Sequence, residues 1–347
     1  MHAVATTAEP SLLMVGNSFT DENNLEEMVQ ALLEEDGRLG GKVYAMRFMR
    51  GASTFAEHAN SAELKSMIAE RRWSWVVLQE QSEKPGFWDT AYESELKESY
   101  EALNVLDSWV REAKAETILM MTWARLNEDP YNPDIFPDFT TMQDRVATGY
   151  YRMQAQISTI ERPVKIAPVG LAFQAIHDSV KDRDPTESGT DFFNLYQEDT
   201  IHPSVQGSYL AACVIYATIT GRDPSRLRYR PMVMQKEQAD KLQAAAQATV
   251  VKFNRENEFN KQASSREPER ASDKGAYVPK EQQDSGGPNS HTHVLLIVAG
   301  CVALLGWVKF GRKTKVPRSP PPGVDMAESI EFTDLNPTAD GGRTNWT

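Results

Sequence analysis

Apolar positions between residues 11 and 260 follow two alternating patterns. Short apolar runs of strand length are each followed by a longer segment in which apolar residues recur at helical spacing. The short runs predict β-strands at residues 11–16, 43–48, 75–81, 117–123 and 164–169. Alternating strands and helices are typical of a parallel sheet with helices on both faces. The pattern therefore predicts an α/β fold with a roughly five-stranded parallel sheet.

The helical segments support the same interpretation and indicate where a site should lie. Residues 208–220 form a strongly apolar helical segment that ends at Gly221. In open parallel sheets, ligands bind beyond the carboxyl ends of the strands. Residues that end or follow the predicted strands are therefore expected together on one rim, and they include Ser18, Gly51, Gln81 and Trp123.

Composition narrows the class of protein. The 347 residues are 40 % hydrophobic and 25 % charged, which suits a soluble globular domain with a sizeable core. The formal net charge of -12 argues against a nucleic-acid partner. Cys213 falls in the apolar helix and Cys301 in a later apolar run, so a disulfide scaffold is not expected.

The chain beyond the predicted globular domain, residues 1–262, divides into three parts. Residues 263–292 are polar and predict a disordered linker. An uncharged apolar run at 294–308 predicts a single transmembrane helix at 293–310, although the run is short and a buried helix is the alternative. The proline-rich tail at 311–347 is predicted to be disordered, and basic residues after the run favour a cytoplasmic location for it in a single-pass membrane protein. Because the N-terminal sequence lacks a signal-peptide pattern, the side on which the domain lies stays open.

Ser18 stands directly after the first predicted strand, in the segment GNSFT. A serine hydroxyl is a weak nucleophile unless a base lies within hydrogen-bond reach and donors stabilise the oxyanion. A strand-to-helix corner exposes the hydroxyl beside backbone N–H groups. The alternative is an ordinary helix N-cap, a role that serine fills routinely.

Asp199 and His202 lie on one short segment, DTIHP. A histidine that acts as a base needs a partner on its second ring nitrogen, and a carboxylate three residues away on a turn can reach it. The alternative is a surface turn with an ordinary aspartate and histidine. Ser18, Asp199 and His202 would supply the three groups of a serine hydrolase.

Two further segments offer donors for an oxyanion. Gly51 follows the second strand, where the absence of a side chain lets its N–H approach a ligand closely. Gln79 and Gln81 end the third strand at period-2 spacing, and a side-chain amide there can donate a hydrogen bond. A turn glycine and a polar strand end are the alternatives.

This combination of segments resembles the SGNH (GDSL-like) hydrolase superfamily over residues 11–222. A poorly characterised branch shares the motifs GNSFT, VVLQEQS, MTWAR and DxxHPSxxGSYLAAC. The resemblance implies a three-layer α/β/α flavodoxin-like sandwich without a cofactor or metal. It also implies that Ser18 is the nucleophile, His202 the base and Asp199 its orienting partner, with the N–H groups of Ser18 and Gly51 as oxyanion donors.

The chain departs from the superfamily after the third strand. The superfamily carries Gly-x-Asn-Asp at this position, whereas this chain reads QEQS. Gln81 is expected to take the place of the asparagine as an oxyanion donor. Gln79, Trp123 and Arg125 are expected to line the substrate pocket, with Arg125 meeting a carboxylate. An edge tryptophan and a surface arginine are the alternative readings of the last two.

The sequence thus predicts a membrane-anchored serine esterase. Its substrate would be a small acyl ester, such as an O-acetylated carbohydrate or a lipid. The alternative is a catalytically inactive module of the same fold that binds a sugar or acyl ligand, and a further alternative is a scaffold whose partner binds the proline-rich tail.

Overall fold

A computed structural model describes residues 9–266, with side chains described as far as residue 257, and these residues lie in one compact unit, Met1–Gly275. Five parallel strands form one sheet in the order β2-β1-β3-β4-β5. The strands are β1 (Ser11–Gly16), β2 (Tyr44–Met49), β3 (Trp75–Leu78), β4 (Glu116–Met120) and β5 (Lys165–Ala167). The predicted five-stranded parallel sheet is confirmed, and its order is that of flavodoxin-like folds.

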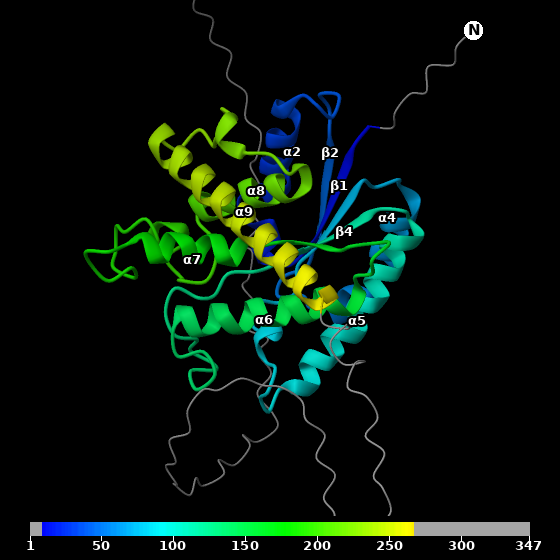
Figure 1. The fold of residues 1–347 in the computed structure, drawn as a ribbon, viewed down its shortest axis with the longest axis horizontal. Helices are drawn as coiled ribbons and strands as arrows, with labels where there is room; N and C mark the ends of the chain where they lie inside the picture. The colour runs from blue at the N-terminus through cyan, green and yellow to red at the C-terminus, as the bar shows by residue number, and fades with distance from the viewer. Residues whose placement is uncertain (1–8, 267–347) are drawn as a thin grey trace, which may run out of the picture. The chain divides into compact units, whose positions relative to one another are not determined.

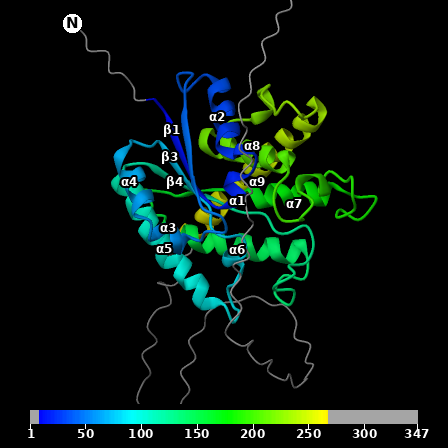
Figure 2. The same cartoon turned by 180° about the vertical axis from the view of Figure 1, so that it is seen from behind.

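Helices cover both faces of this sheet. They are α1 (Ser18–Asp21), α2 (Leu25–Asp36), α3 (Phe55–Ala59), α4 (Ala62–Glu70), α5 (Glu93–Glu112), α6 (Phe139–Ile157), α7 (Val169–Ser179), α8 (Val205–Thr220) and α9 (Lys236–Arg266). Short 3-10 turns are η1 (Glu22–Asn24), η2 (Lys84–Gly86), η3 (Phe193–Leu195) and η4 (Pro224–Arg226). Figure 1 shows α2, α8 and α9 on one side of the sheet and α4 and α5 on the other, and Figure 2 shows the same from behind.

The burial of each strand follows from its place in the sheet. All six residues of β1 are buried, because β1 lies between β2 and β3 and helices cover both of its faces. This explains why its sequence is a continuous apolar run rather than an alternating one. In contrast, β2 lies at an edge and leaves Tyr44 and Met46 more than one third exposed.

Helix α8 is the most deeply buried helix of the described region and has clear end signals. The Ser204 hydroxyl caps its first turn by accepting hydrogen bonds from the N–H groups of Gln206 and Gly207. Gly221 ends it in the left-handed conformation, with φ of 67°. Because α8 contacts α2, α7 and α9 as well as β5, it is apolar on nearly every face.

The strand order creates a topological switch point beside β1. The chain leaves β1 to form β2 on one side and returns to form β3 on the other. Gly16 at the end of β1 pairs with Met49, and Val15 pairs with Leu78. The segments that follow β1, β2 and β3 therefore start next to one another at one rim, where a crevice for ligands is expected.

The end of β1 is tightly packed under the first of these segments. Gln79 is fully buried, and its Oε1 accepts hydrogen bonds from the N–H of Asn17 at 3.0 Å and from the hydroxyl of Thr20 at 2.9 Å. A methyl group on Gly16 would overlap both Gln79 Oε1 and Thr20 Oγ1. Only glycine at position 16 thus leaves room for Gln79 to hold the turn that follows.

Several predictions made from the sequence concern residues outside the described range. They are the linker beyond residue 266, the transmembrane helix at 293–310 and the tail at 311–347, and they stay predictions. Within residues 9–266, no helix is both long enough and apolar enough to cross a bilayer. Helix α9 runs to Arg266, beyond the residue 262 at which the sequence analysis ends the globular domain.

Replacing Gly16 with alanine should destabilise the protein, because the added methyl group must displace Gln79 or Thr20 in a packed site. Overpacking of this kind costs about 1–3 kcal/mol, which lowers the melting temperature by about 3–10 °C. Thermal unfolding of the full chain measures this. Gly51→Ala is the matched control, since a Cβ at Gly51 meets nothing within 4 Å. Equal melting temperatures for the two variants would show that the packing at Gly16 has been misjudged.

Candidate active site

Ser18 is the first residue of α1, immediately after the turn that leaves β1. Asn17 caps this helix in an extended conformation, and its Oδ1 accepts a hydrogen bond from the N–H of Phe19 at 3.1 Å. The cap is thus asparagine and not Ser18, so the Ser18 hydroxyl is left available for another partner. Gln79 fixes the turn from below through the N–H of Asn17.

Ser18, His202 and Asp199 form one chain of hydrogen bonds. His202 Nε2 lies 2.8 Å from Ser18 Oγ, although the two residues are 184 positions apart in the sequence. His202 Nδ1 lies 2.5 Å from Asp199 Oδ2. The imidazole therefore has the serine on one ring nitrogen and the carboxylate on the other, which is the arrangement a nucleophile and its base require.

Asp199 is held for this contact by the backbone of the turn that follows it. Its Oδ1 accepts hydrogen bonds from the N–H groups of Ile201 and His202, each at 2.9 Å, across a turn in which Thr200 has a φ of 64°. Partial burial by itself raises the pKa of Asp199, but hydrogen bonds from His202 and from the two N–H groups outweigh it and lower the pKa. Asp199 is thus a carboxylate at neutral pH.

Other elements fix the position of the segment that carries His202. The N–H of Gln197 donates to the carbonyl of His202 at 2.8 Å, and Tyr196 forms an antiparallel bridge with Pro203. The indole N–H of Trp123 donates to the carbonyl of Ile201 at 3.2 Å. The segment after β4 therefore supports the segment that carries His202.

An aromatic stack lies beneath the hydrogen-bonded chain. Phe19 and Trp123 stack with ring centroids 4.5 Å apart, and Trp123 stacks in turn on Phe173 at 4.8 Å. The rings of Phe19 and His202 also meet in a T-shaped arrangement, with their centroids 5.7 Å apart. Trp123 is 1 % exposed, so the expectation that it lines a substrate pocket is wrong. It supports His202 and Ser18 from within the core instead.

Gln79 also departs from its expected place. The apolar run at residues 75–81 predicts a third strand that continues to residue 81, with Gln79 and Gln81 facing the same way. Strand β3 ends at Leu78, and the period-2 rule does not apply beyond it. Gln79 is fully buried under the turn at Asn17 and does not line a pocket, whereas Gln81 is partly exposed.

The Gln81 side chain has a fixed orientation. Its Oε1 accepts hydrogen bonds from the N–H groups of Glu83 at 2.8 Å and Lys84 at 3.1 Å. Because two N–H donors require an oxygen at this position, the Nε2 group must point the other way, and it has no partner among the described residues. The Nε2 group of Gln81 is therefore available to donate a hydrogen bond to a ligand.

Two backbone N–H groups at the same rim have free capacity as well. Within residues 9–266, no hydrogen bond engages the N–H of Ser18 or that of Gly51. The side chain of Asn17 connects their segments, since its Nδ2 donates to the carbonyl of Ser53 at 3.1 Å. Gly51 lies in an exposed turn two residues before Ser53.

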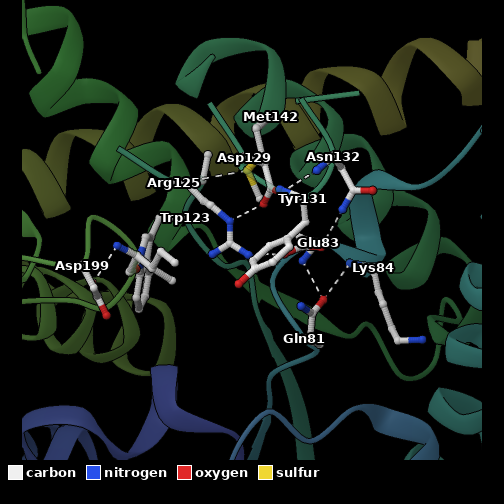
Figure 3. A network of polar contacts seen from close by, with 12 residues as sticks. Gln81, Glu83, Lys84, Trp123, Arg125, Asp129, Tyr131, Asn132, Met142 and Asp199 are labelled. Carbon is white, nitrogen blue, oxygen red and sulfur yellow. Dashed lines mark hydrogen bonds and ion pairs between the residues drawn. The ribbon is translucent and has the colours of Figure 1, made fainter. Parts of the chain in front are cut away.

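Arg125 does not face a substrate. It is 7 % exposed and is bound on one side by Glu83 and on the other by Asp129 (Figure 3). Burial by itself raises the pKa of Asp129, but Arg125 and the N–H groups of Tyr131 and Asn132 hold it below its usual value. The expectation that Arg125 meets a substrate carboxylate is thus wrong, because two internal carboxylates occupy its guanidinium.

Tyr131 lies on the loop that this ion network holds, and it was not among the residues expected at the site. Asp129 Oδ1 accepts hydrogen bonds from the N–H groups of Tyr131 at 2.8 Å and Asn132 at 2.9 Å. The loop after β4 is held at its base by these hydrogen bonds, while Tyr131 itself is 79 % exposed. The only signal in the sequence was the irregular, proline-containing segment itself, which does not tell which residue faces outward.

The rim shows no sign of a metal centre. In the part of the chain that the structure describes, no group of three or more histidine, cysteine, aspartate or glutamate residues is arranged to hold a metal ion. Cys213 is buried within α8, and burial raises its pKa to about 12.

Comparisons with known proteins show which solved structures have a similar fold. No family model matches the chain, and no curated protein matches it either. A DUF4886 family protein from Bacteroides uniformis has a similar structure, with a TM-score of 0.55, 19 % sequence identity, and coverage of 70 % of this chain and 95 % of that one. At this identity the likeness shows a shared fold.

Two further solved structures are similar at lower TM-scores. A protein from Slackia heliotrinireducens that is assigned to the SGNH hydrolases has a TM-score of 0.46 and 24 % identity, and the match covers 61 % of this chain and 99 % of that one. An acetylxylan esterase from Geobacillus stearothermophilus has a TM-score of 0.43 and 15 % identity, with coverage of 61 % and 94 %. Both sequence identities lie below 25 %, and neither likeness shows what this chain does.

Proposed function

We propose that this protein is a serine ester hydrolase of the SGNH type. The observation that carries the proposal is the hydrogen-bonded chain from Ser18 through His202 to Asp199, with 2.8 Å between Ser18 Oγ and His202 Nε2. An ordinary helix cap would not place the hydroxyl against an imidazole that a carboxylate orients. The side chain of His202 is 29 % exposed, so a substrate can reach the pair.

In the proposed mechanism, Ser18 Oγ attacks the carbonyl carbon of the ester while His202 Nε2 takes the hydroxyl proton. The tetrahedral intermediate collapses, the proton passes from His202 to the leaving alcohol, and an acyl-enzyme forms on Ser18. Water then attacks the acyl group as His202 again takes a proton, which it returns to Ser18 when the acid leaves. Asp199 keeps the imidazole in the required tautomer and stabilises its charge.

Three donors from three segments would stabilise the oxyanion. They are the N–H of Ser18 after β1, the N–H of Gly51 after β2 and the Nε2 of Gln81 after β3. Each has free hydrogen-bonding capacity within the described residues, and Gln81 is oriented by two backbone donors on its other side. Preorganised donors of this kind are the largest single contribution in many acyl-transfer enzymes.

The proposed substrates are small acyl esters, with O-acetylated carbohydrates and lipid esters as the two candidate classes. Trp123 and Arg125 are buried, so neither lines the site. The exposed side chain that lies beside Arg125 in Figure 3 is Tyr131, on the loop after β4. The exposed phenol ring offers a flat apolar face with a polar tip, which suits contact with the alcohol part of an ester. Tyr131 is therefore the proposed substrate contact on this side.

Ser18→Ala in the full chain should lower kcat/KM for p-nitrophenyl acetate by about 10³-fold or more, because the nucleophile is lost. Hydrolysis is followed by release of p-nitrophenolate, with thermal unfolding as the check that the variant is folded. Ser66→Ala, an exposed serine on α4, is the matched control and should retain wild-type activity. A folded Ser18→Ala protein that keeps its activity would rule out Ser18 as the nucleophile.

Gln81→Ala should lower kcat by about 10²-fold with little change in KM, since an oxyanion donor acts in the transition state and not in substrate binding. Steady-state kinetics on the same ester separates the two constants. The control is Gln206→Ala, a partly exposed glutamine in the first turn of α8. A change in KM alone would assign Gln81 to substrate binding instead.

Tyr131→Ala should raise KM for esters with a bulky alcohol by about 3–10-fold, the equivalent of one aromatic contact of about 0.5–1.5 kcal/mol. KM and kcat for p-nitrophenyl acetate should change little. Tyr131→Phe keeps the ring and should behave like the wild type if stacking is the source of binding. An equal rise in KM for small and bulky esters would contradict a specific contact and would indicate that the loop has loosened as a whole.

A further inference from the structure

Glu80 is a fully buried carboxylate that the proposed chemistry does not use. It lies two residues after the end of β3, between Gln79 and Gln81. Its Oε1 accepts hydrogen bonds from the N–H groups of Phe55 at 2.9 Å and Gln81 at 2.7 Å, and its Oε2 accepts one from the hydroxyl of Ser99 at 2.5 Å. A buried carboxylate is costly unless it is well paired, so its presence requires a reason.

The two N–H groups on Oε1 belong to the segments that carry two of the proposed oxyanion donors. Phe55 begins α3, directly after the turn that contains Gly51. Gln81 supplies the side-chain amide. One oxygen atom of Glu80 therefore fixes the segment after β2 relative to the segment after β3.

Three side-chain ties, each a hydrogen bond that links two of the segments, lie at the rim, and Glu80 makes one of them. Asn17 Nδ2 donates to the carbonyl of Ser53 and so joins the segments after β1 and β2. Gln79 Oε1 accepts from the N–H of Asn17 and joins the segments after β1 and β3. Glu80 joins the remaining pair, after β2 and β3. Each segment is thereby tied to both of the others.

We propose that Glu80 is a positioning residue that sets the spacing of the Gly51 and Gln81 donors around the oxyanion. The inference rests on the proposed function, because it assigns Glu80 a role in that same reaction. Glu80 does not touch the reacting atoms. It acts through the two N–H groups that it holds, and a shift of either segment would misplace a donor by a distance that matters for catalysis.

The tie does not depend on the charge of Glu80. Burial raises its pKa to about 7, against hydrogen bonds from Ser99, Gln81 and Phe55 and the nearby charge of Lys84. Among the other elements packed around it, α6 contributes Tyr150, whose hydroxyl accepts from the N–H of Glu80 at 3.4 Å. A proton on Oε2 can be donated to the Ser99 oxygen, and Oε1 still accepts both N–H groups.

A neutral amide at this position should therefore preserve the tie, whereas an apolar side chain of similar size should remove it. Glu80→Gln keeps an oxygen for the N–H groups of Phe55 and Gln81, and its amide nitrogen can donate to Ser99. Glu80→Met has similar volume and no comparable acceptor. Glu80→Asp keeps the charge but withdraws the carboxylate by about one C–C bond length, roughly 1.5 Å, so it cannot reach both N–H groups.

The test is steady-state hydrolysis of p-nitrophenyl acetate by the full chain and these three variants. Glu80→Gln should retain kcat within about threefold of the wild type, while Glu80→Met and Glu80→Asp should lose about 10–100-fold in kcat with KM within about threefold. Thr117→Val is the matched control for a buried polar loss, since its hydroxyl binds Asp107. It should lower the melting temperature without lowering kcat.

The outcomes separate this inference from the proposed function. If the wild type shows Ser18-dependent hydrolysis and Glu80→Asp or Glu80→Met retains its kcat, the positioning role is overturned and the serine mechanism stands. A Glu80→Gln protein that loses as much kcat as Glu80→Asp overturns the role of the shared oxygen, even if Glu80→Met does not fold. Absence of Ser18-dependent hydrolysis in the wild type overturns the proposed function and this inference together.

Discussion

The site depends on the cross-connection of three segments that leave adjacent parallel strands. Strand order alone brings the ends of β1, β2 and β3 to one rim, but it does not fix the loops that follow to within a fraction of an ångström. Side chains do that here: Asn17, Gln79 and Glu80 each join two of the three segments through buried hydrogen bonds. Such bonds are costly to break, because each leaves a polar group unsatisfied in the interior. The rim is thus built to hold donors at fixed positions, which is what electrostatic stabilisation of an oxyanion requires.

A second set of contacts holds His202 against Ser18. The stack of Phe19, Trp123 and Phe173 carries the segment after β1 and supports the His202 ring, while Trp123 also binds the backbone of the His202 segment. The buried Arg125 network anchors the adjacent loop. Its charges contribute little net stability by themselves, but each carboxylate also receives polar donors, so the loop is fixed in one conformation. Buried side chains therefore support Ser18, His202 and the loop from the side of the core.

The sequence predicted the elements better than it predicted exposure. Apolar runs located all five strands, and chain order placed Ser18, Gly51 and Gln81 at the same rim. The three-residue spacing also indicated that Asp199 could reach His202 on a turn, and the two side chains do lie in contact. Gln79, Trp123 and Arg125 were misplaced for a common reason. Each lies at the rim, but whether a rim side chain faces outward depends on partners distant in sequence, such as Asn17 for Gln79, Phe19 for Trp123 and Glu83 for Arg125. Tyr131 and Glu80 were missed because no local pattern marks an exposed ring or a shared oxygen.

Covalent labelling of the nucleophile tests the central claim most directly. The full chain is treated with a fluorophosphonate, which reacts with an activated serine, and the modified residue is located by peptide mass spectrometry. The account predicts a single adduct on Ser18 that is lost in His202→Ala, since an unassisted hydroxyl reacts slowly. Absence of an adduct on Ser18 in the folded wild-type protein, or equal labelling in His202→Ala, would contradict it.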